Sequence, residues 1–329
     1  MKKRILSLLA GLCLLVFVTT AARVAADDFA EGSFNRTLKV TGAADLEVTT
    51  GSGGITVHAA GAGEVRVTAT IRVSSWRMSR KEAEDKIQYI EAHPPIVQDG
   101  NVIRIGRIED EDLRRNVSIS YDMTVPADTR LRSATGSGSQ TIEGIHGPLT
   151  AETGSGSIRA SNIGADVEAR TGSGGIDLQS VTGTVNASTG SGSIHALRIA
   201  GGFSGHTGSG GVEFEQTAPG NSDIETGSGS IEIRGANGSL RVRTGSGSIT
   251  AEGKPAGDWH LHSGSGGVTV HLPQDAAFEL DARASSGHVE TSFPVTVQGT
   301  ISPRELHGKV RGGGPLLELS TSSGSIRIE

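Results

Sequence analysis

Apolar and polar residues alternate along this chain in two short runs that recur every 18 or 19 residues from residue 135 onward. When each repeat is counted from a threonine as position 1, positions 6, 8, 11, 15 and 17 are mostly apolar, and positions 7, 9, 16 and 18 are mostly polar. One column of the pattern, position 15, contains Val167, Val185 and Phe203. Alternation at period two is typical of strands that bury one face. Each repeat therefore predicts two short strands whose apolar side chains point inward.

A four-residue motif, Thr-Gly-Ser-Gly, opens each repeat. It begins at Thr50, Thr135, Thr153, Thr171, Thr189, Thr207, Thr226 and Thr244, with variant copies at Ser263, Ala284 and Thr321. So short a fixed period indicates one structural unit stacked on copies of itself. Parallel stacking would align the apolar columns into ladders with about 4.8 Å between coils. The sequence predicts an all-β fold, a single-stranded parallel β-solenoid (β-helix) with about 18 residues per coil and regular coils over about 135–290.

The corner motif has two interpretations. Its glycines permit backbone angles that other residues resist. If its Thr and Ser side chains point outward, they form two parallel hydroxyl rows that can meet water or sugar hydroxyls. Alternatively, the corner bends and the Ser hydroxyls cap the backbone groups of their own turn.

The N-terminal residues have the pattern of an export signal. Lys2, Lys3 and Arg4 precede an apolar run, and Ala26 is a small residue at a plausible cleavage site. We therefore expect a signal peptide at 1–26, with an uncleaved membrane anchor as the alternative. A flexible lead at 27–36 and a solenoid domain at 37–329 are expected to follow.

Residues 75–131 interrupt the repeat. Ser79 and Glu82 have the spacing of a capping box, which predicts a helix at about 80–92. Apolar residues keep helical spacing within it: Ala83, Ile87 and Ile90. The charged stretch 109–115 indicates a solvated loop. We expect this irregular insertion to cover an edge of the solenoid rather than to form an enzyme domain.

Composition narrows the possible chemistry. Cys13 is the only cysteine and lies in the predicted signal, so the mature chain can form neither disulfides nor thiolate sites. The first 26 residues carry four basic and no acidic side chains, so their removal changes the formal charge from −6 to −6 − 4 = −10. An acidic chain without a basic run is a poor nucleic-acid binder.

Two outward-facing pairs are the candidates for chemistry. Glu213 and Glu232 are neighbours in the position-7 column and could act as an acid–base pair. His260 and His262 are the only close histidine pair, but a zinc site would need further ligands. Solvated faces of alternating charge, with two exposed histidines on one strand, are the simpler explanation of both pairs. We therefore assign no catalytic, cofactor-binding or metal-binding residue and expect no cofactor.

The corner ladder, the segment 121–126 and the ending 319–326 together resemble a bacterial family. It is the "putative adhesin" family of unknown function that carries a β-helix of this kind. The resemblance covers roughly 37–329 and implies a β-solenoid at the cell surface. The family has no agreed catalytic residues, so the resemblance implies none here.

These observations favour a non-catalytic structural or adhesive interaction module that is secreted or exposed on the envelope. The expected location is the periplasm, the cell envelope or the extracellular space. The partner candidates are a cell-surface glycan or an envelope protein, with no nucleic acid, and a membrane only if the signal segment stays uncleaved. Two alternatives remain: a carbohydrate-active β-helix enzyme, and an envelope-stress regulatory protein that binds a membrane partner.

Overall fold

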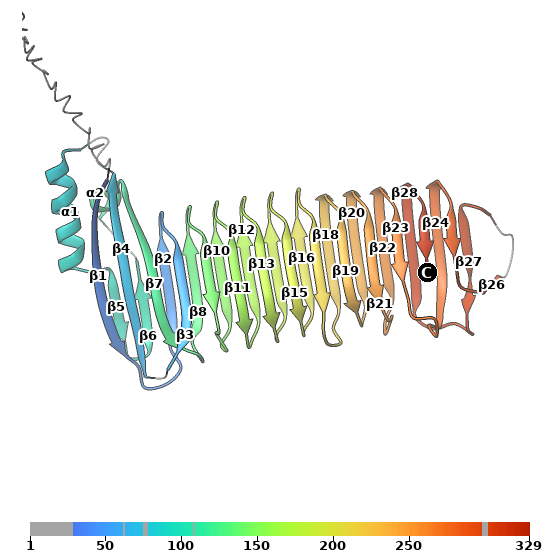
Figure 1. The fold of residues 1–329 in the computed structure, drawn as a ribbon, viewed down its shortest axis with the longest axis horizontal. Helices are drawn as coiled ribbons and strands as arrows, with labels where there is room; N and C mark the ends of the chain where they lie inside the picture. The colour runs from blue at the N-terminus through green and yellow to red at the C-terminus, as the bar shows by residue number, and fades with distance from the viewer. Residues whose placement is uncertain (1–28, 62, 75–77, 107, 109, 298–301) are drawn as a thin grey trace, which may run out of the picture.

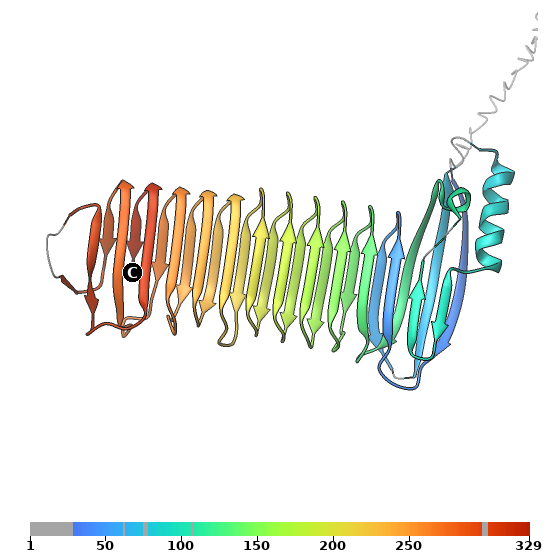
Figure 2. The ribbon, with the colours of Figure 1, turned by 180° about the vertical axis from the view of Figure 1, so that it is seen from behind.

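The chain folds into an elongated stack of β-coils with a cap at each end (Figures 1 and 2). The computed structural model describes residues 29–329 except 62, 75–77, 107, 109 and 298–301. The predicted signal peptide, 1–26, therefore lies outside the described residues. Within the described ranges, neither helix combines the length and apolar character that crossing a bilayer requires.

Two long sheets form the opposite faces of the stack. Sheet I contains, in spatial order, β1 (Phe29–Lys39), β4 (Glu64–Ser74), β7 (Val117–Pro126), β3 (Ile55–Ala60), β9 (Gln140–Glu143), β11 (Ile158–Ile163), β13 (Ile176–Val181), β15 (Ile194–Ile199), β17 (Val212–Gln216), β19 (Ile231–Ala236), β21 (Ile249–Gly253), β23 (Val268–His271), β29 (Ile326–Ile328) and β25 (Val289–Thr291). Sheet II contains, in spatial order, β26 (Val295–Val297), β27 (Glu305–Val310), β24 (Phe278–Ser286), β28 (Leu316–Ser323), β22 (Trp259–Ser265), β20 (Leu240–Ser246), β18 (Ser222–Ser228), β16 (Phe203–Thr207), β14 (Val185–Thr189), β12 (Val167–Thr171), β10 (Leu149–Thr153), β8 (Arg130–Thr135), β2 (Asp45–Thr50), β6 (Val102–Ile105) and β5 (Ile96–Asp99).

The central coils have the parallel register that the repeat predicts. Val167 pairs with Val185 and Val185 with Phe203, so position 15 is one column across successive coils. All three side chains are buried, as are the alanines of position 17 and the isoleucines of position 6. A narrow core between the two sheets therefore runs along the stack, and the predicted β-solenoid is confirmed.

The threonine of each corner points into the core, which excludes the outward threonine row, one of the two interpretations of the motif. Thr171 is 6% exposed, and its Oγ1 donates to the Gly156 carbonyl of the preceding coil at 2.8 Å. The same oxygen accepts from the Gly174 N–H of its own turn at 3.1 Å. Threonine, rather than serine, thus caps the turn and joins it to the preceding coil. The serines of position 3 are exposed, so one of the two hydroxyl rows considered for the corner exists.

The corner glycines are required by close stacking, which corrects the prediction that backbone angles select them. A Cβ on Gly174 would lie 1.9 Å from the Gly156 carbonyl oxygen, and the other inner coils repeat this approach. At position 4, a clearly left-handed φ occurs at Gly53, Gly266, Gly287 and Gly324, in coils at or near the two ends of the stack. Within the array it is therefore the neighbouring backbone that excludes a side chain.

Replacing Thr171 with valine should lower the free energy of unfolding by about 1–3 kcal/mol, because the change keeps the shape and leaves a buried N–H and carbonyl without their partner. Thr171→Ser keeps the hydroxyl, as Ser263 does naturally with Gly247 at 2.8 Å, and is the matched control. Urea unfolding followed by circular dichroism measures both. A loss for Ser without a loss for Val would show that the methyl group, not the hydroxyl, matters.

An antiparallel cap covers the N-terminal end of the stack. β7 pairs with β4 and β4 with β1, and α1 (Arg80–Ala92) packs on β1 and β4. The helix and its Ser79–Glu82 capping box are confirmed, and its three predicted apolar residues are buried. The flexible lead at 27–36 is wrong from residue 29 onward, because these residues belong to β1. A Cβ on Gly32 would meet Ile87 at 2.1 Å, so the glycine lets the helix lie against the strand.

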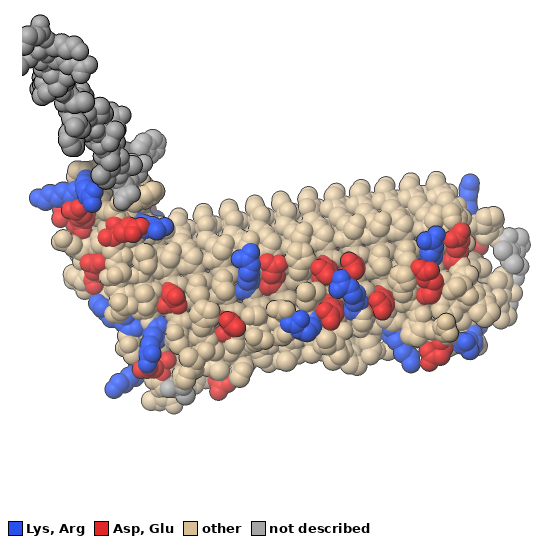
Figure 3. Space-filling model, viewed as in Figure 1, with Lys and Arg blue, Asp and Glu red and all other residues tan. Residues whose placement is uncertain are grey.

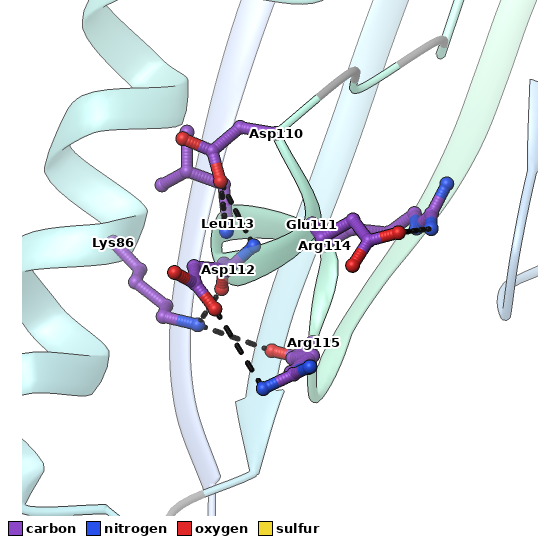
Figure 4. A network of polar contacts seen from close by, with 7 residues as sticks. All are labelled: Lys86, Asp110, Glu111, Asp112, Leu113, Arg114 and Arg115. Atoms are coloured by element: carbon purple, nitrogen blue, oxygen red, sulfur yellow. Dashed lines mark hydrogen bonds and ion pairs between the residues drawn. The ribbon is translucent and has the colours of Figure 1, made fainter.

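The charged stretch after β6 contains a short helix, α2 (Glu111–Arg114), where the sequence predicted a loop. The Asp110 side chain accepts from the backbone N–H groups of Asp112 and Leu113 at 2.8 and 3.2 Å (Figure 4). The Lys86 ammonium of α1 donates to the Arg115 carbonyl at 3.2 Å. A side-chain cap and a lysine from the neighbouring helix thus hold this segment against the cap.

The C-terminal coils are stacked out of chain order. β28 lies between β22 and β24, and β29 lies between β23 and β25. The coil formed by β24 and β25 is therefore separated from the preceding coil by the last strands of the chain. The prediction of regular coils to about 290 is wrong beyond β23, which ends at His271. β27 pairs antiparallel with β24 and β26 pairs antiparallel with β27, and the two strands form the second cap.

Candidate functional site

The outer face of sheet I carries a chain of polar contacts at position 7. Arg159 lies 3.4 Å from Asp177, and Asp177 lies 2.9 Å from the Nδ1 of His195. Each of these side chains is roughly half-exposed. Figure 3 shows charges of both signs scattered in small groups over one face of the stack, beside an uncharged ridged edge. A face of this kind offers polar contacts along its length rather than at one point.

Glu213 and Glu232, the predicted acid–base pair, are neighbours in register but are bridged by a third side chain. The Arg234 guanidinium lies 2.6 Å from Glu213 and 2.9 Å from Glu232. Hydrogen bonds to Glu213 and then Glu232 raise the pKa of Arg234 above its ordinary value. An acid–base pair needs carboxyl groups that are free to meet a substrate, whereas both carboxylates here are held by the same guanidinium. The geometry is therefore that of a charge-balanced surface cluster.

His260 and His262 both lie on the outer face of sheet II, where alternation placed them. The Nδ1 of His260 is 2.7 Å from Glu318 Oε2, and the Nδ1 of His262 is 2.9 Å from Ser320 Oγ. Both partners belong to β28, which the sequence did not place beside β22. Among the described residues, no group of three or more potential ligands could hold a metal ion.

Two arginines that the sequence analysis did not single out complete this cluster. Arg241 is in register with His260, and Arg243 with His262. The four side chains line a hollow of about 270 Å³ together with Leu261, Glu318 and Ser320. The signal was present in the sequence as Arg-x-Arg followed, 19 residues later, by His-x-His. We name these four residues the Arg/His cluster.

A second hollow adjoins the Arg/His cluster and shares Arg241 and His260 with it. It has a volume of about 500 Å³. Its polar lining comes from successive coils of sheet II: Thr184, Ser204, Asn221, Asp223, Ser239 and Asp258. We name it the polar groove. Because each coil contributes to its lining, the groove runs along the stack, across the strands.

A larger hollow of about 860 Å³ lies at the N-terminal cap, lined in part by Phe29, Arg72 and Arg114. Tyr121 is buried in this cap, and its hydroxyl has no hydrogen-bond partner among the described residues. Burial raises the pKa of Tyr121 above its ordinary range, which keeps the phenol neutral. A neutral, enclosed hydroxyl of this kind is a packing element of the cap.

Comparison with known protein families identifies the repeat. The model of the Toastrack family, DUF4097, matches residues 163–329, which is half of the chain. The chain belongs to the Toastrack family. The matched region begins in β11 and includes the Arg/His cluster, the polar groove and the C-terminal cap. The resemblance drawn from the corner ladder is confirmed, since a stacked-strand family of this kind is what the repeat predicted.

Solved structures also match this chain in the comparison. A "putative adhesin" from Bacteroides fragilis is 14% identical, with a TM-score of 0.33 over 91% of this chain and 97% of its own. A "putative cell adhesion protein" from Clostridium sporogenes is 12% identical, with a TM-score of 0.22 over 91% and 99%. A "putative lipid binding protein" from Parabacteroides distasonis is 12% identical, with a TM-score of 0.27 over 90% and 96%. No curated protein matched the sequence.

Proposed function

We propose that this Toastrack protein is a non-catalytic interaction module, structural or adhesive, that acts outside the cytoplasm on the cell envelope or beyond it. The observation that carries the proposal is the stack itself. Each coil repeats the same corner and presents two outward faces, so contacts can be spread over a long surface. Repeated weak contacts of this kind multiply through avidity.

The state of the best candidate acid pair supports binding rather than catalysis. Arg234 bridges Glu213 and Glu232 on an open face, where solvent reaches all three side chains. Retention of a partner needs no proton transfer, whereas glycoside cleavage by paired carboxylates needs one of them protonated. This charge-balanced surface cluster is thus suited to binding a polar ligand.

Substitution of Glu213 by glutamine should leave binding to bacterial cells or to immobilised glycans unchanged within about twofold, because one exposed carboxylate contributes little to a distributed surface. Binding is measured by a glycan array and a cell-retention assay, and cleavage by release of reducing ends. Thr250→Ser, in the same position-7 column, is the matched control. If the protein depolymerises a polysaccharide and Glu213→Gln or Glu232→Gln abolishes that activity, the enzyme alternative replaces this proposal.

Export is the part of the proposal that rests on the sequence of the N-terminus. We expect cleavage after Ala26, so that N-terminal sequencing of protein from an expressing bacterium begins at Asp27. The protein should be recovered outside the cytoplasm. Recovery of a chain that begins at Met1 in the membrane fraction would instead favour an uncleaved anchor.

A further inference from the structure

We propose that the Arg/His cluster binds the carboxylate groups of an acidic polysaccharide whose sugar chain lies along the polar groove. This inference rests on the proposed function and names its ligand class and its site. It starts from the in-register pairs Arg241–His260 and Arg243–His262 on adjacent strands. Neighbouring strands are about 4.8 Å apart and alternate residues about 7 Å apart, so the four side chains project from the corners of a small rectangle.

The two arginines are available to an incoming anion. Asp223 and Glu225 stand in register with them on the preceding strand, yet within the described part of the chain neither Arg241 nor Arg243 forms an ion pair. Another arginine of the same surface is neutralised: Arg170, in the column of Arg243, pairs with Glu168 and with Glu152 at 3.4 Å. The guanidinium groups instead line the hollow that holds His260 and His262. A guanidinium binds a carboxylate through two parallel N–H donors.

The histidines are oriented by the inserted strand β28. The Nδ1–H of His260 donates to Glu318, which leaves the Nε2 of that ring for a ligand. When the ring is neutral, Nε2 accepts from a sugar hydroxyl, and when it is protonated, Nε2 donates to a carboxylate. Ser320 contacts the Nδ1 of His262 in the same way. Each imidazole is therefore held at its Nδ1 and presents its Nε2 to a ligand, beside the guanidinium groups of Arg241 and Arg243.

The polar groove selects a sugar chain rather than a denser polyanion. It offers hydroxyl and amide groups from Ser204, Asn221 and Ser239 and carboxylates from Asp223 and Asp258. Sugar hydroxyls donate to such carboxylates, whereas a nucleic acid with a charge on every phosphate would be repelled by them. The formal charge of the mature chain, −10 by the subtraction above, disfavours nucleic acid further. A polysaccharide with spaced carboxylates suits both parts of the site.

The test measures binding of oligogalacturonate and of uncharged dextran oligomers to the mature chain by calorimetry. Oligogalacturonate should bind, dextran should bind at least about tenfold more weakly, and raising the salt from about 50 to about 500 mM should weaken the binding of oligogalacturonate. The double variant R241Q/R243Q should lose at least about tenfold in affinity. The matched control Arg170→Gln, which changes a neutralised arginine on the same face, should bind as the wild type does. All these side chains are exposed, so thermal melting should confirm that each variant folds.

Three results would overturn the inference: no binding of oligogalacturonate, equal binding of dextran, or an unchanged affinity in R241Q/R243Q. If cells or other glycans are still retained in any of these cases, the interaction-module proposal stands and only the site is wrong. If the wild type binds no cell and no glycan, or cleaves the oligosaccharide, the proposed function itself fails.

Discussion

Replacing Gly174 with alanine is expected to lower the free energy of unfolding by about 2–3 kcal/mol, the cost of forcing extra atoms into a packed site. The new Cβ would lie 1.9 Å from the Gly156 oxygen, 2.4 Å from the Gly156 carbon and 2.9 Å from the Ser157 nitrogen. All three are backbone atoms of the preceding coil, so no side chain can move to make room. The two coils would have to separate, which would also strain the hydrogen bonds of Thr171.

The neighbouring glycine provides a matched control. A Cβ on Gly175 would lie 3.5 Å from the Ser193 oxygen, an ordinary contact, and Ser157 and Ser193 occupy this position in the adjacent coils. Gly175→Ala should therefore be nearly silent in urea unfolding followed by circular dichroism. Equal effects of the two alanines would mean that the coils do not stack at the distance described.

The corner motif contains one feature that the sequence predicts, the inward apolar columns, and one that it contains but that we did not use, the inward direction of Thr171. The inward columns at positions 15 and 17 were predicted correctly, because alternation in a strand depends only on residue type and spacing. The same alternation, continued by two residues from Ala169, makes Thr171 inward as well. We left its direction open because threonine is polar, although a buried hydroxyl is stable when it is fully hydrogen-bonded. Its main-chain acceptor, Gly156, lies 15 residues away and is reached only through stacking.

The order of the terminal coils could not be predicted from the sequence. Every coil presents the same inward pattern, so Leu317 and Leu319 can stack on any neighbour with equal apolar complementarity. In the structure they pair with Trp259 and Leu261, and β24 is displaced to the outside. The start of β1 was missed for a related reason. Its covered face includes Gly32, which contributes no apolar side chain to the pattern, and only the packing of α1 shows that this face is covered. The capping box of α1, by contrast, could be predicted from the sequence, because it depends only on the four residues from Ser79 to Glu82.

The candidate site was partly predictable. The spacing of 19 residues placed Glu213 beside Glu232, and both lie where expected. Their bridge, Arg234, stands two residues after Glu232 on the same face, so the sequence contained that information too. Glu318, which orients His260, comes from an inserted strand 58 residues away, and nothing in the local pattern indicates this contact. The contacts made by the inserted strand β28 therefore cannot be predicted from the repeat pattern alone.

The second large effect concerns the core. Val185 is fully buried between Val167 and Phe203 in the position-15 column, so Val185→Asp should place an uncompensated charge among apolar side chains. Such a charge costs about 3–5 kcal/mol, which is a large part of the stability of most domains. Asn186→Asp, one residue further on, points to solvent and should cost well under 1 kcal/mol, chiefly through repulsion from Glu168. Chemical unfolding of the two variants compares these costs.

The pH dependence of Val185→Asp separates a buried charge from mere loss of packing. Burial would raise the pKa of the new carboxyl in the folded state above its unfolded value of about 3.9. The folded state then binds more protons than the unfolded state between these two values, so the penalty is full at high pH and shrinks as the pH falls through the folded pKa. The stability deficit should therefore be smaller at about pH 4.5 than at about pH 7.5, by up to about 1.4 kcal/mol for each unit crossed below the folded pKa. A deficit that stays constant with pH, or one that equals the deficit of Asn186→Asp, would show that position 15 does not face the core.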